Sequence, residues 1–100
     1  MILLTGATGF VGTHLLKALL EKGYKIRALI LPDEQKPFDE TNLEWIRGDI
    51  RDKESLRNCF SGISIVLHMA GVVASPDNGF TFSVNFDGTR NLVDICIEKK

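Results

Sequence analysis

The stretch ILLTGATGFVG, residues 2–12, joins a short apolar segment to a helix-like pattern through three evenly spaced glycines. Ile2–Leu4 is apolar at every position, as expected for a strand that is covered on both faces. Apolar residues recur at every fourth position from Phe10 onward, which predicts an amphipathic helix. Glycine is favoured where a backbone turns with positive φ or where another group approaches closer than a Cβ allows. We therefore expect a strand, a ligand-binding turn and a helix, the turn being marked by Gly6, Gly9 and Gly12.

Strand-like and helix-like segments alternate along the rest of the chain. This alternation is typical of an α/β fold, in which right-handed crossovers build a parallel sheet with helices on both faces. We therefore predict a Rossmann-type doubly wound parallel sheet with its first four strands in the order 3-2-1-4, as an incomplete domain. The predicted elements after the first helix, which ends at Gly23, are a strand over Lys25–Leu31, a loop over Pro32–Asn42, a strand over Leu43–Arg47, a helix over Lys53–Phe60 capped by Asp52, a strand over Ile63–Ala70, a loop over Gly71–Gly79 and a helix over Phe80–Lys100.

The apolar spacing also predicts which side of each helix is buried. Residues three or four positions apart lie on one face of a helix, so each apolar repeat is expected to face the core. The side chains predicted to pack inward are Val11, Leu15, Leu16, Leu19 and Leu20 in the first helix, Leu56 and Phe60 in the second, and Phe82, Phe86, Thr89, Leu92, Val93 and Cys96 in the last.

The composition limits the possible functions. A chain of 100 residues builds one small domain, and 44% hydrophobic with 25% charged residues is typical of a globular protein. The net charge of -1 gives no sign of a nucleic-acid or membrane partner. The N-terminal apolar run is too short for a signal peptide, and it lacks the basic residues that flank one. Cys59 and Cys96 lack the spacing of a metal or redox motif, so we expect reduced thiols, no metal site and a cytoplasmic location.

The three glycines have separate expected roles. In a doubly wound sheet this turn lies at the carboxyl edge, where ligands bind, and the amides at the helix N-terminus favour a phosphate. We expect Gly6 to make a tight turn, Gly9 to let a pyrophosphate approach the backbone, and Gly12 to let helix and sheet pack closely. A glycine-containing turn without a ligand is the alternative. A Walker A loop is excluded, because no Gly-Lys-Ser/Thr sequence follows.

Four motifs carry a resemblance to a known family. Thr5–Gly12 (TGATGFVG) resembles the cofactor loop of the extended short-chain dehydrogenase/reductases, the branch of sugar-nucleotide epimerases, dehydratases and dihydroflavonol-reductase-like enzymes. Gly48–Asp52 (GDIRD) resembles the motif after the third strand, and Val66–Gly71 (VLHMAG) resembles the end of the fourth strand. Asn85–Leu92 (NFDGTRNL) is similar to the family's Asn-Val-x-Gly-Thr-x-Asn-Leu helix motif. The motifs follow the family's order and span essentially the whole chain.

The resemblance implies an NAD or NADP cofactor and a dinucleotide-binding Rossmann domain over residues 1–100. In the family, the Asp of the second motif and the apolar residue after it contact the adenine. The end of the fourth strand runs along the nicotinamide ribose. The cofactor-binding residues expected on this basis are Gly6, Ala7, Thr8, Gly9, Phe10, Val11, Gly12, Asp49, Ile50, Met69, Ala70 and Gly71.

Some polar residues of these motifs also have purely structural interpretations. The alternative role of Asp49 is to cap a turn or a helix. His68 lies in an apolar strand, which is more typical of a core histidine with satisfied hydrogen bonds than of a ligand. His14 is expected to be an ordinary helix residue, and Asn85 to hydrogen-bond the neighbouring strand.

Catalysis in this family uses a Tyr-x-x-x-Lys pair on the helix after the last one predicted here. The resemblance implies that the tyrosine moves the substrate proton, while the lysine lowers the tyrosine pKa and holds the ribose. The only tyrosine is Tyr24, and Ala28 stands four residues later, in a strand. We therefore expect no catalytic residue in this chain, a catalytic pair beyond Lys100, and the N-terminal half of a longer enzyme that transfers hydride between nicotinamide and a substrate carbinol or ketone. The alternative is a non-catalytic regulatory module that binds dinucleotide.

The end of the second strand bears on the choice between NAD and NADP. NAD-preferring relatives place an Asp at the position of Ile30, and NADP-preferring relatives place an Arg at that of Leu31; this sequence has neither. Asp33 and Glu34 follow Pro32, and an acid there would reach the ribose 2′-OH and repel a 2′-phosphate. The sequence therefore favours NAD slightly.

The expected partners are the dinucleotide and a small-molecule substrate. The strand predicted over Ile63–Ala70 would leave an unpaired apolar edge, and such an edge is a template for pairing with another chain. We therefore expect a homo-oligomer without nucleic-acid or membrane partners.

Overall fold

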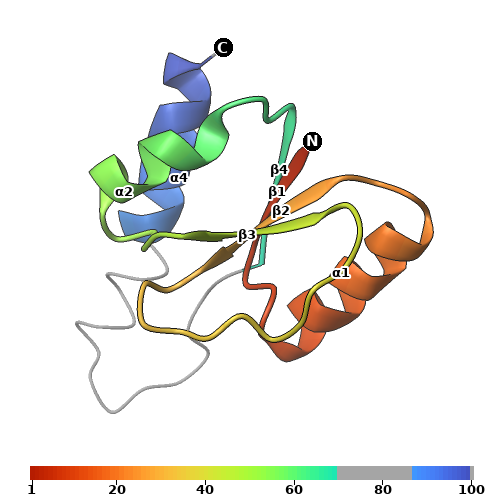
Figure 1. Cartoon of the computed structure of the whole chain (residues 1–100). Helices are drawn as coiled ribbons and strands as arrows, with labels where there is room; N and C mark the ends of the chain where they lie inside the picture. Colours follow the sequence, from red (N-terminus) through yellow and green to blue (C-terminus); the bar gives the residue numbers. More distant parts are fainter. Residues whose placement is uncertain (70–86, 100) are drawn as a thin grey trace.

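Four parallel strands form a single sheet in this computed structural model, which describes residues 1–69 and 87–99. The strands are β1 (Ile2–Thr5), β2 (Ile26–Ile30), β3 (Leu43–Arg47) and β4 (Ile65–His68). Their order is β3-β2-β1-β4, and every neighbouring pair is parallel (Figure 1). The predicted strand order and fold class are confirmed.

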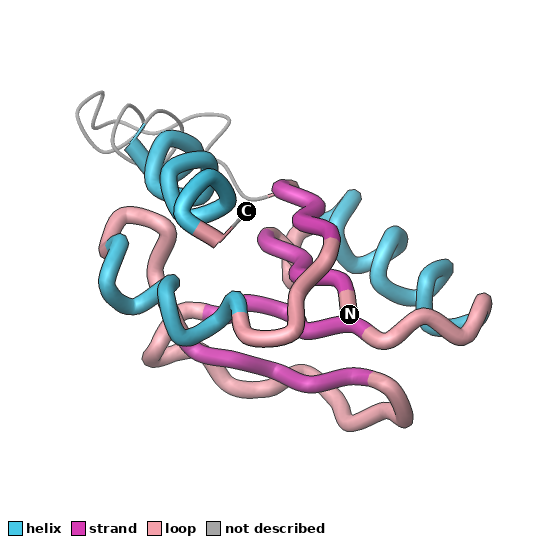
Figure 2. Tube along the Cα trace, turned by 90° about the horizontal axis from the view of Figure 1, so that it is seen from above, coloured by secondary structure: helices cyan, strands magenta, loops and turns pink. Residues whose placement is uncertain are grey.

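Helices cover both faces of the sheet. α1 (Phe10–Glu21) lies on one face, while α2 (Lys53–Arg57) and α4 (Gly88–Glu98) lie on the other (Figures 1 and 2). The short 3₁₀-helix η1 (Asn58–Phe60) continues from α2. The predicted helix over 53–60 is therefore present, but its last turn is tighter than an α-helix.

Two apolar clusters hold the three layers together, because successive strand residues point to opposite faces. In β1, Leu3 faces α2 and α4, whereas its neighbours in the strand face α1. The cluster on the α1 face contains Ile2, Leu4, Ala7, Leu16, Ile26, Ala28, Ile30 and Trp45. The cluster on the other face contains Leu3, Leu29, Ile50, Leu56, Cys59, Phe60, Leu92 and Ile95.

The predicted helix ends are present. Gly23 lies two residues after the end of α1 with φ 86°, and its amide donates to the carbonyl of Leu20. The amide of Tyr24 donates to the carbonyl of Leu19, which completes a Schellman motif. At the start of α2, the carboxylate of Asp52 accepts hydrogen bonds from two amides of the first turn, as predicted for an N-cap.

The predicted buried face of the last helix is wrong in part. Val93 is 50% exposed and Cys96 is exposed, whereas Leu92 and Ile95 are buried. The helix carries apolar residues on two adjacent sides, so spacing alone does not choose between them. In the structure, Leu92 and Ile95 pack in the apolar cluster between the sheet and α2, and Lys53 of α2 pairs with Asp94 beside them at 3.2 Å.

Other boundaries and faces also differ from prediction. β2 and β4 are shorter than the segments predicted over 25–31 and 63–70. In α1, Leu16 is fully buried, but Val11 is 58% exposed because it lies in the first turn, at the sheet edge. The predicted loop over 71–79, the first part of the helix predicted from 80, and the packing of Phe82 and Phe86 lie outside the described residues.

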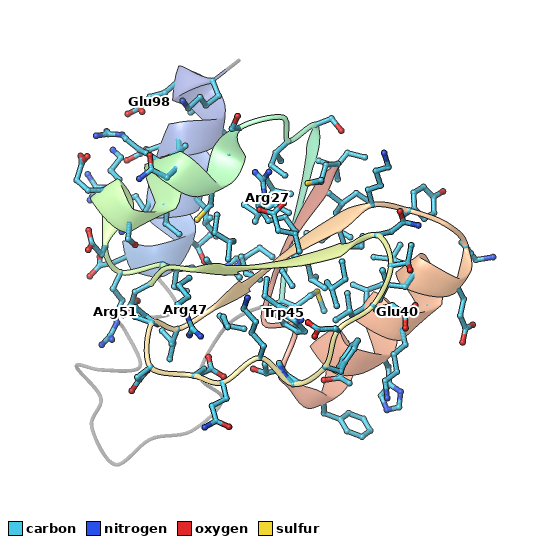
Figure 3. All side chains as sticks on the ribbon, in the orientation of Figure 1. Arg27, Glu40, Trp45, Arg47, Arg51 and Glu98 are labelled. Carbon is cyan, nitrogen blue, oxygen red and sulfur yellow. The ribbon has the colours of Figure 1, made fainter. Side chains whose placement is uncertain are left out.

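Two side chains on the edge strand β3 and its neighbour β2 fix the connections around the sheet (Figure 3). The indole N–H of Trp45 donates to the carbonyl of Phe38 at 2.7 Å and so holds the long β2–β3 loop. Arg27 donates to the carbonyls of Cys59 and Ser61, both at 2.7 Å, and pairs with Glu44 at 3.3 Å. Within the described part of the chain, no helix has the length and apolarity needed to cross a membrane.

Candidate functional site

The glycine loop between β1 and α1 is a tight turn held by its own backbone. Gly6 has φ 75°, a conformation that L side chains rarely adopt, and its carbonyl accepts the amide of Gly9 at 3.1 Å. The hydroxyl of Thr13, in α1, donates to the carbonyl of Ala7 at 2.9 Å. The loop is therefore fixed to the helix that follows it, and the tight turn predicted at Gly6 is present.

Gly12 and Gly9 differ in what surrounds them. A Cβ built on Gly12 would lie 1.7 Å from the carbonyl oxygen of Gly6, so the close helix–loop packing predicted for this glycine is present. A Cβ on Gly9 would lie 3.4 Å from the same oxygen, an ordinary contact, and Gly9 has φ -77°. Among the described residues, backbone conformation and packing therefore require glycine at positions 6 and 12, but not at position 9.

The backbone amides at the start of α1 lie at the carboxyl edge of the sheet. The first turn of the helix places no negatively charged side chain beside them. Gly9 is the N-cap and makes no side-chain capping bond, and the first turn of α1 contains no acidic residue. The side chains of Phe10 and Val11 are 82% and 58% exposed, and Thr8 is exposed as well. The loop thus presents backbone N–H groups that suit an anion, because none of its exposed side chains is negatively charged.

Asp49 lies directly after β3, where its carboxylate folds onto the next turn. It accepts the backbone amide of Arg51 at 2.9 Å and the Nη2 of the Arg51 guanidinium at 2.7 Å. These hydrogen bonds, the side-chain one foremost, lower the pKa of Asp49 below its ordinary value, against the opposing effect of burial. The local capping role considered for Asp49 is therefore present, and an adenine contact would have to share an acceptor already used by Arg51.

Ile50 is enclosed by the first turns of α4. Its carbonyl accepts the side-chain amide of Asn91 at 2.8 Å. A Cβ on Gly88 would lie 2.6 Å from the Cδ1 of Ile50, so Gly88 is what lets α4 approach this segment. The helix motif that suggested the family resemblance thus positions the segment after β3.

His68, the last residue of β4, uses both ring nitrogens. Its Nδ1 is 2.6 Å from the hydroxyl of Thr5, and its Nε2 is 2.9 Å from the hydroxyl of Thr89. Burial lowers the pKa of His68 below its ordinary value, which favours the neutral ring. The interpretation of His68 as a histidine with satisfied hydrogen bonds is confirmed.

Three of the segments proposed from sequence meet at the carboxyl edge of the sheet (Figure 1). The glycine loop follows β1, Asp49 and Ile50 follow β3, and Met69 follows β4. The amide of Met69 donates to the carbonyl and to the hydroxyl of Thr5, both at 3.1 Å, so the ends of β1 and β4 lie side by side. Ala70, Gly71 and Asn85 lie outside the described residues.

The fold and this edge agree with what sequence comparison finds. The profile of the NAD dependent epimerase/dehydratase family matches residues 2–100. The chain belongs to this family. It is 38% identical over 94 residues to sterol demethylase protein B of Methylococcus capsulatus and 32% identical over 94 residues to human sterol-4-alpha-carboxylate 3-dehydrogenase, decarboxylating. These matches cover 91% and 93% of this chain, which spans only 29% and 24% of the two relatives.

Solved structures of family members have the same fold. UDP-glucose 4-epimerase of Thermus thermophilus, in complex with NAD, superposes with a TM-score of 0.82 at 30% identity. A monomeric L-threonine 3-dehydrogenase from a metagenome, in its apo form, superposes with a TM-score of 0.85 at 32% identity. These matches cover 95% and 96% of this chain and 33% and 32% of the others, so the chain spans about a third of each structure.

Arg47, at the carboxyl end of β3, was not predicted from the sequence to have a role near the site. Its guanidinium donates to the carbonyls of Leu31, Pro32 and Glu34 (Figure 3). The carboxylate of Glu34 in turn accepts the amide of Leu31 at 2.9 Å. These bonds fold the chain after β2 into a defined turn. No local pattern predicts them, because Arg47 reaches backbone atoms more than ten residues away.

Gly88, Thr89 and Asn91 belong to the helix motif Asn85–Leu92, and the family resemblance did not predict them as cofactor-binding residues. Each of them contacts one of the candidate segments or a residue beside one. Among residues 1–69 and 87–99, no group of three or more His, Cys, Asp or Glu side chains is placed to hold a metal ion.

Proposed function

We propose that this chain is the dinucleotide-binding part of an NAD(P)-dependent oxidoreductase, epimerase or dehydratase. Gly9 carries the proposal. Backbone conformation accounts for Gly6 and helix packing accounts for Gly12, whereas at Gly9 a Cβ would meet only an ordinary contact among the described residues. A group that approaches from outside explains a glycine that this part of the chain does not require at the start of a helix, and a pyrophosphate is the group that such a position suits.

The proposed cofactor contacts follow the three segments at the sheet edge. The amides of residues 6–12 would hold the pyrophosphate, Asp49 and Ile50 the adenine, and residues 69–71 the nicotinamide ribose. The bound nicotinamide would supply hydride transfer at its C4. The contribution of this chain is to orient the dinucleotide along the edge.

We propose NAD in preference to NADP. Glu34 supports this choice, because its carboxylate accepts the amide of Leu31 and so lies beside the end of β2. In dinucleotide-binding folds this position faces the ribose 2′-OH, and a carboxylate there repels a 2′-phosphate. The nearby guanidinium of Arg47 faces carbonyl oxygens of the same turn.

The substrate and the catalytic residues belong to the proposal as well. The relatives are named as a sterol dehydrogenase, a demethylase protein and an epimerase, which supports turnover of a small-molecule carbinol or ketone over a module that only binds dinucleotide. We propose that a Tyr-x-x-x-Lys pair outside these residues performs the proton transfer. A homo-oligomer and a cytoplasmic location stay predictions from the sequence.

Titration calorimetry of the full-length protein with NAD and with NADP tests the proposal. We expect NAD to bind, and we expect Gly9→Val to abolish binding because its side chain occupies the space of the pyrophosphate. The circular dichroism spectrum of Gly9→Val should match that of the wild type. Binding of neither dinucleotide by the wild type, or unchanged affinity in Gly9→Val, would contradict the proposed site. Affinity for NADP at least tenfold higher than for NAD would reverse the cofactor choice.

A further inference from the structure

A path of hydrogen bonds begins at Thr5, the last residue of β1, and reaches the end of β4. Thr13 binds the carbonyl of Ala7 within the loop, and Thr5 directly precedes the loop. The fully buried hydroxyl of Thr5 accepts the amide of Met69 and lies 2.6 Å from the Nδ1 of His68. The end of β1, directly before the glycine loop, is therefore joined to the end of β4 through side chains as well as through the sheet.

The same imidazole continues the path to α4. Its Nε2 lies 2.9 Å from the hydroxyl of Thr89 in the first turn of that helix. The neighbouring residues Gly88 and Asn91 hold Ile50, through close packing and through a 2.8 Å hydrogen bond to its carbonyl. The first turn of α4 thus contacts His68 on one side and the segment after β3 on the other.

An imidazole ring is a rigid spacer, because its two nitrogens lie on a planar ring and cannot move relative to each other. A hydroxyl on each nitrogen therefore fixes the distance between β1 and the first turn of α4. We propose that His68 and Thr89 are positioning residues, a bridge that holds the adenine segment around Ile50 at the correct distance from the glycine loop. This inference rests on the proposed function, because it concerns how the dinucleotide site is held and not whether it exists.

The chemistry of the ring suits this role. Burial keeps the pKa of His68 low, so the ring is neutral, with one nitrogen that donates and one that accepts. A hydroxyl satisfies either nitrogen, because it both donates and accepts. Thr89 is the better residue to change, since Thr5 also holds the amide of Met69.

The test compares Thr89→Val, which replaces the hydroxyl by a methyl group of similar size, with Thr89→Ser, which keeps the hydroxyl. Calorimetry of the full-length protein with NAD should show affinity about three- to tenfold weaker for Thr89→Val, the size expected from the loss of one hydrogen bond. Thr89→Ser should stay within about twofold of the wild type. The ¹⁵N chemical shift of His68 Nε2 should change in Thr89→Val and return toward the wild-type value in Thr89→Ser.

Arg57→Ala provides a matched control for general loosening of α4. Arg57 contacts Glu98, at the far end of the helix from Thr89. If Arg57→Ala weakens NAD as much as Thr89→Val does, or if Thr89→Val leaves both the affinity and the His68 signal unchanged, the bridge is refuted while the cofactor site stands. If the wild type binds neither NAD nor NADP, the proposed function itself is refuted. Weaker binding in Thr89→Val alone, with rescue by Thr89→Ser, establishes the bridge.

Discussion

Substitution of Gly12 by alanine should destabilise the fold through a single backbone contact. The added Cβ would lie 1.7 Å from the carbonyl oxygen and 2.6 Å from the carbonyl carbon of Gly6, and ordinary contacts begin near 3.4 Å. Both atoms belong to the backbone, so no side-chain rotation relieves the overlap. α1 and the loop must separate by roughly 1.7 Å at this point.

The magnitude follows from three contributions. Overpacking in a well-packed region costs about 1–3 kcal/mol. Displacement of the Gly6 carbonyl weakens the hydrogen bond that it accepts from Gly9, at a cost of about 0.5–1.5 kcal/mol. Alanine returns about 1 kcal/mol, because it favours the helix more than glycine does. We expect Gly12→Ala to lower the free energy of unfolding by about 2 kcal/mol and the melting temperature by about 8–16 °C.

Gly9→Ala is the matched control, three residues away in the same motif. Its Cβ would make only the 3.4 Å contact, and φ is -77°, so its free energy of unfolding should stay within about 0.5 kcal/mol of the wild type. Urea unfolding followed by circular dichroism measures both variants. Equal stability of Gly12→Ala and the wild type, or equal losses in the two variants, would refute the division of roles between these glycines.

Three further predictions concern side chains of the structure. Asn91→Ala should lower the free energy of unfolding by about 1–2 kcal/mol, because the carbonyl of Ile50 loses its donor; unfolding curves of the variant that match the wild type would contradict this. Trp45→Phe removes the donor to the carbonyl of Phe38, and it should increase hydrogen exchange in the β2–β3 loop before it affects the centre of the sheet; uniform exchange would argue against the anchor. Burial lowers the pKa of His68 from 6.5, so the unfolded chain binds this proton more readily and stability should fall as the pH drops below about 6.5. His68→Gln should reduce that loss between about pH 7.5 and 5.5 in urea titrations, and an unchanged pH slope would show that His68 is not its source.

Local patterns predicted the parts of the fold that depend on near neighbours in the chain. The strand predicted over Leu43–Arg47 has the same bounds as β3. Asp52 caps α2 as predicted, because an N-cap needs only amides two and three residues away. Gly6 and Gly12 have the conformation and packing expected from the strand–turn–helix pattern.

Features that depend on distant partners were not predictable in this way. α4 buries Leu92 and Ile95 against residues of the sheet and of α2 that lie far away in sequence, so apolar spacing alone wrongly predicts a buried Val93. The sequence marked Asp49 as a residue of interest, but not that Arg51 would occupy its carboxylate. The hydroxyl of Thr89 meets His68 only once both β4 and α4 are in place.

The central place of β1 in the sheet affects the order in which its neighbours become available during synthesis. β1 is made before the other three strands of this sheet, but its two neighbours are β2, which ends at Ile30, and β4, which begins at Ile65. A ribosome that adds about 5–20 residues per second needs roughly 2–7 s to pass from one to the other. During that interval a nascent chain that has paired β1 with β2 exposes the other side of β1, with its fully buried Leu3 and Leu4, to the surrounding solution. Of the two interior strands, β1 thus waits longer than β2 for its second neighbour during synthesis.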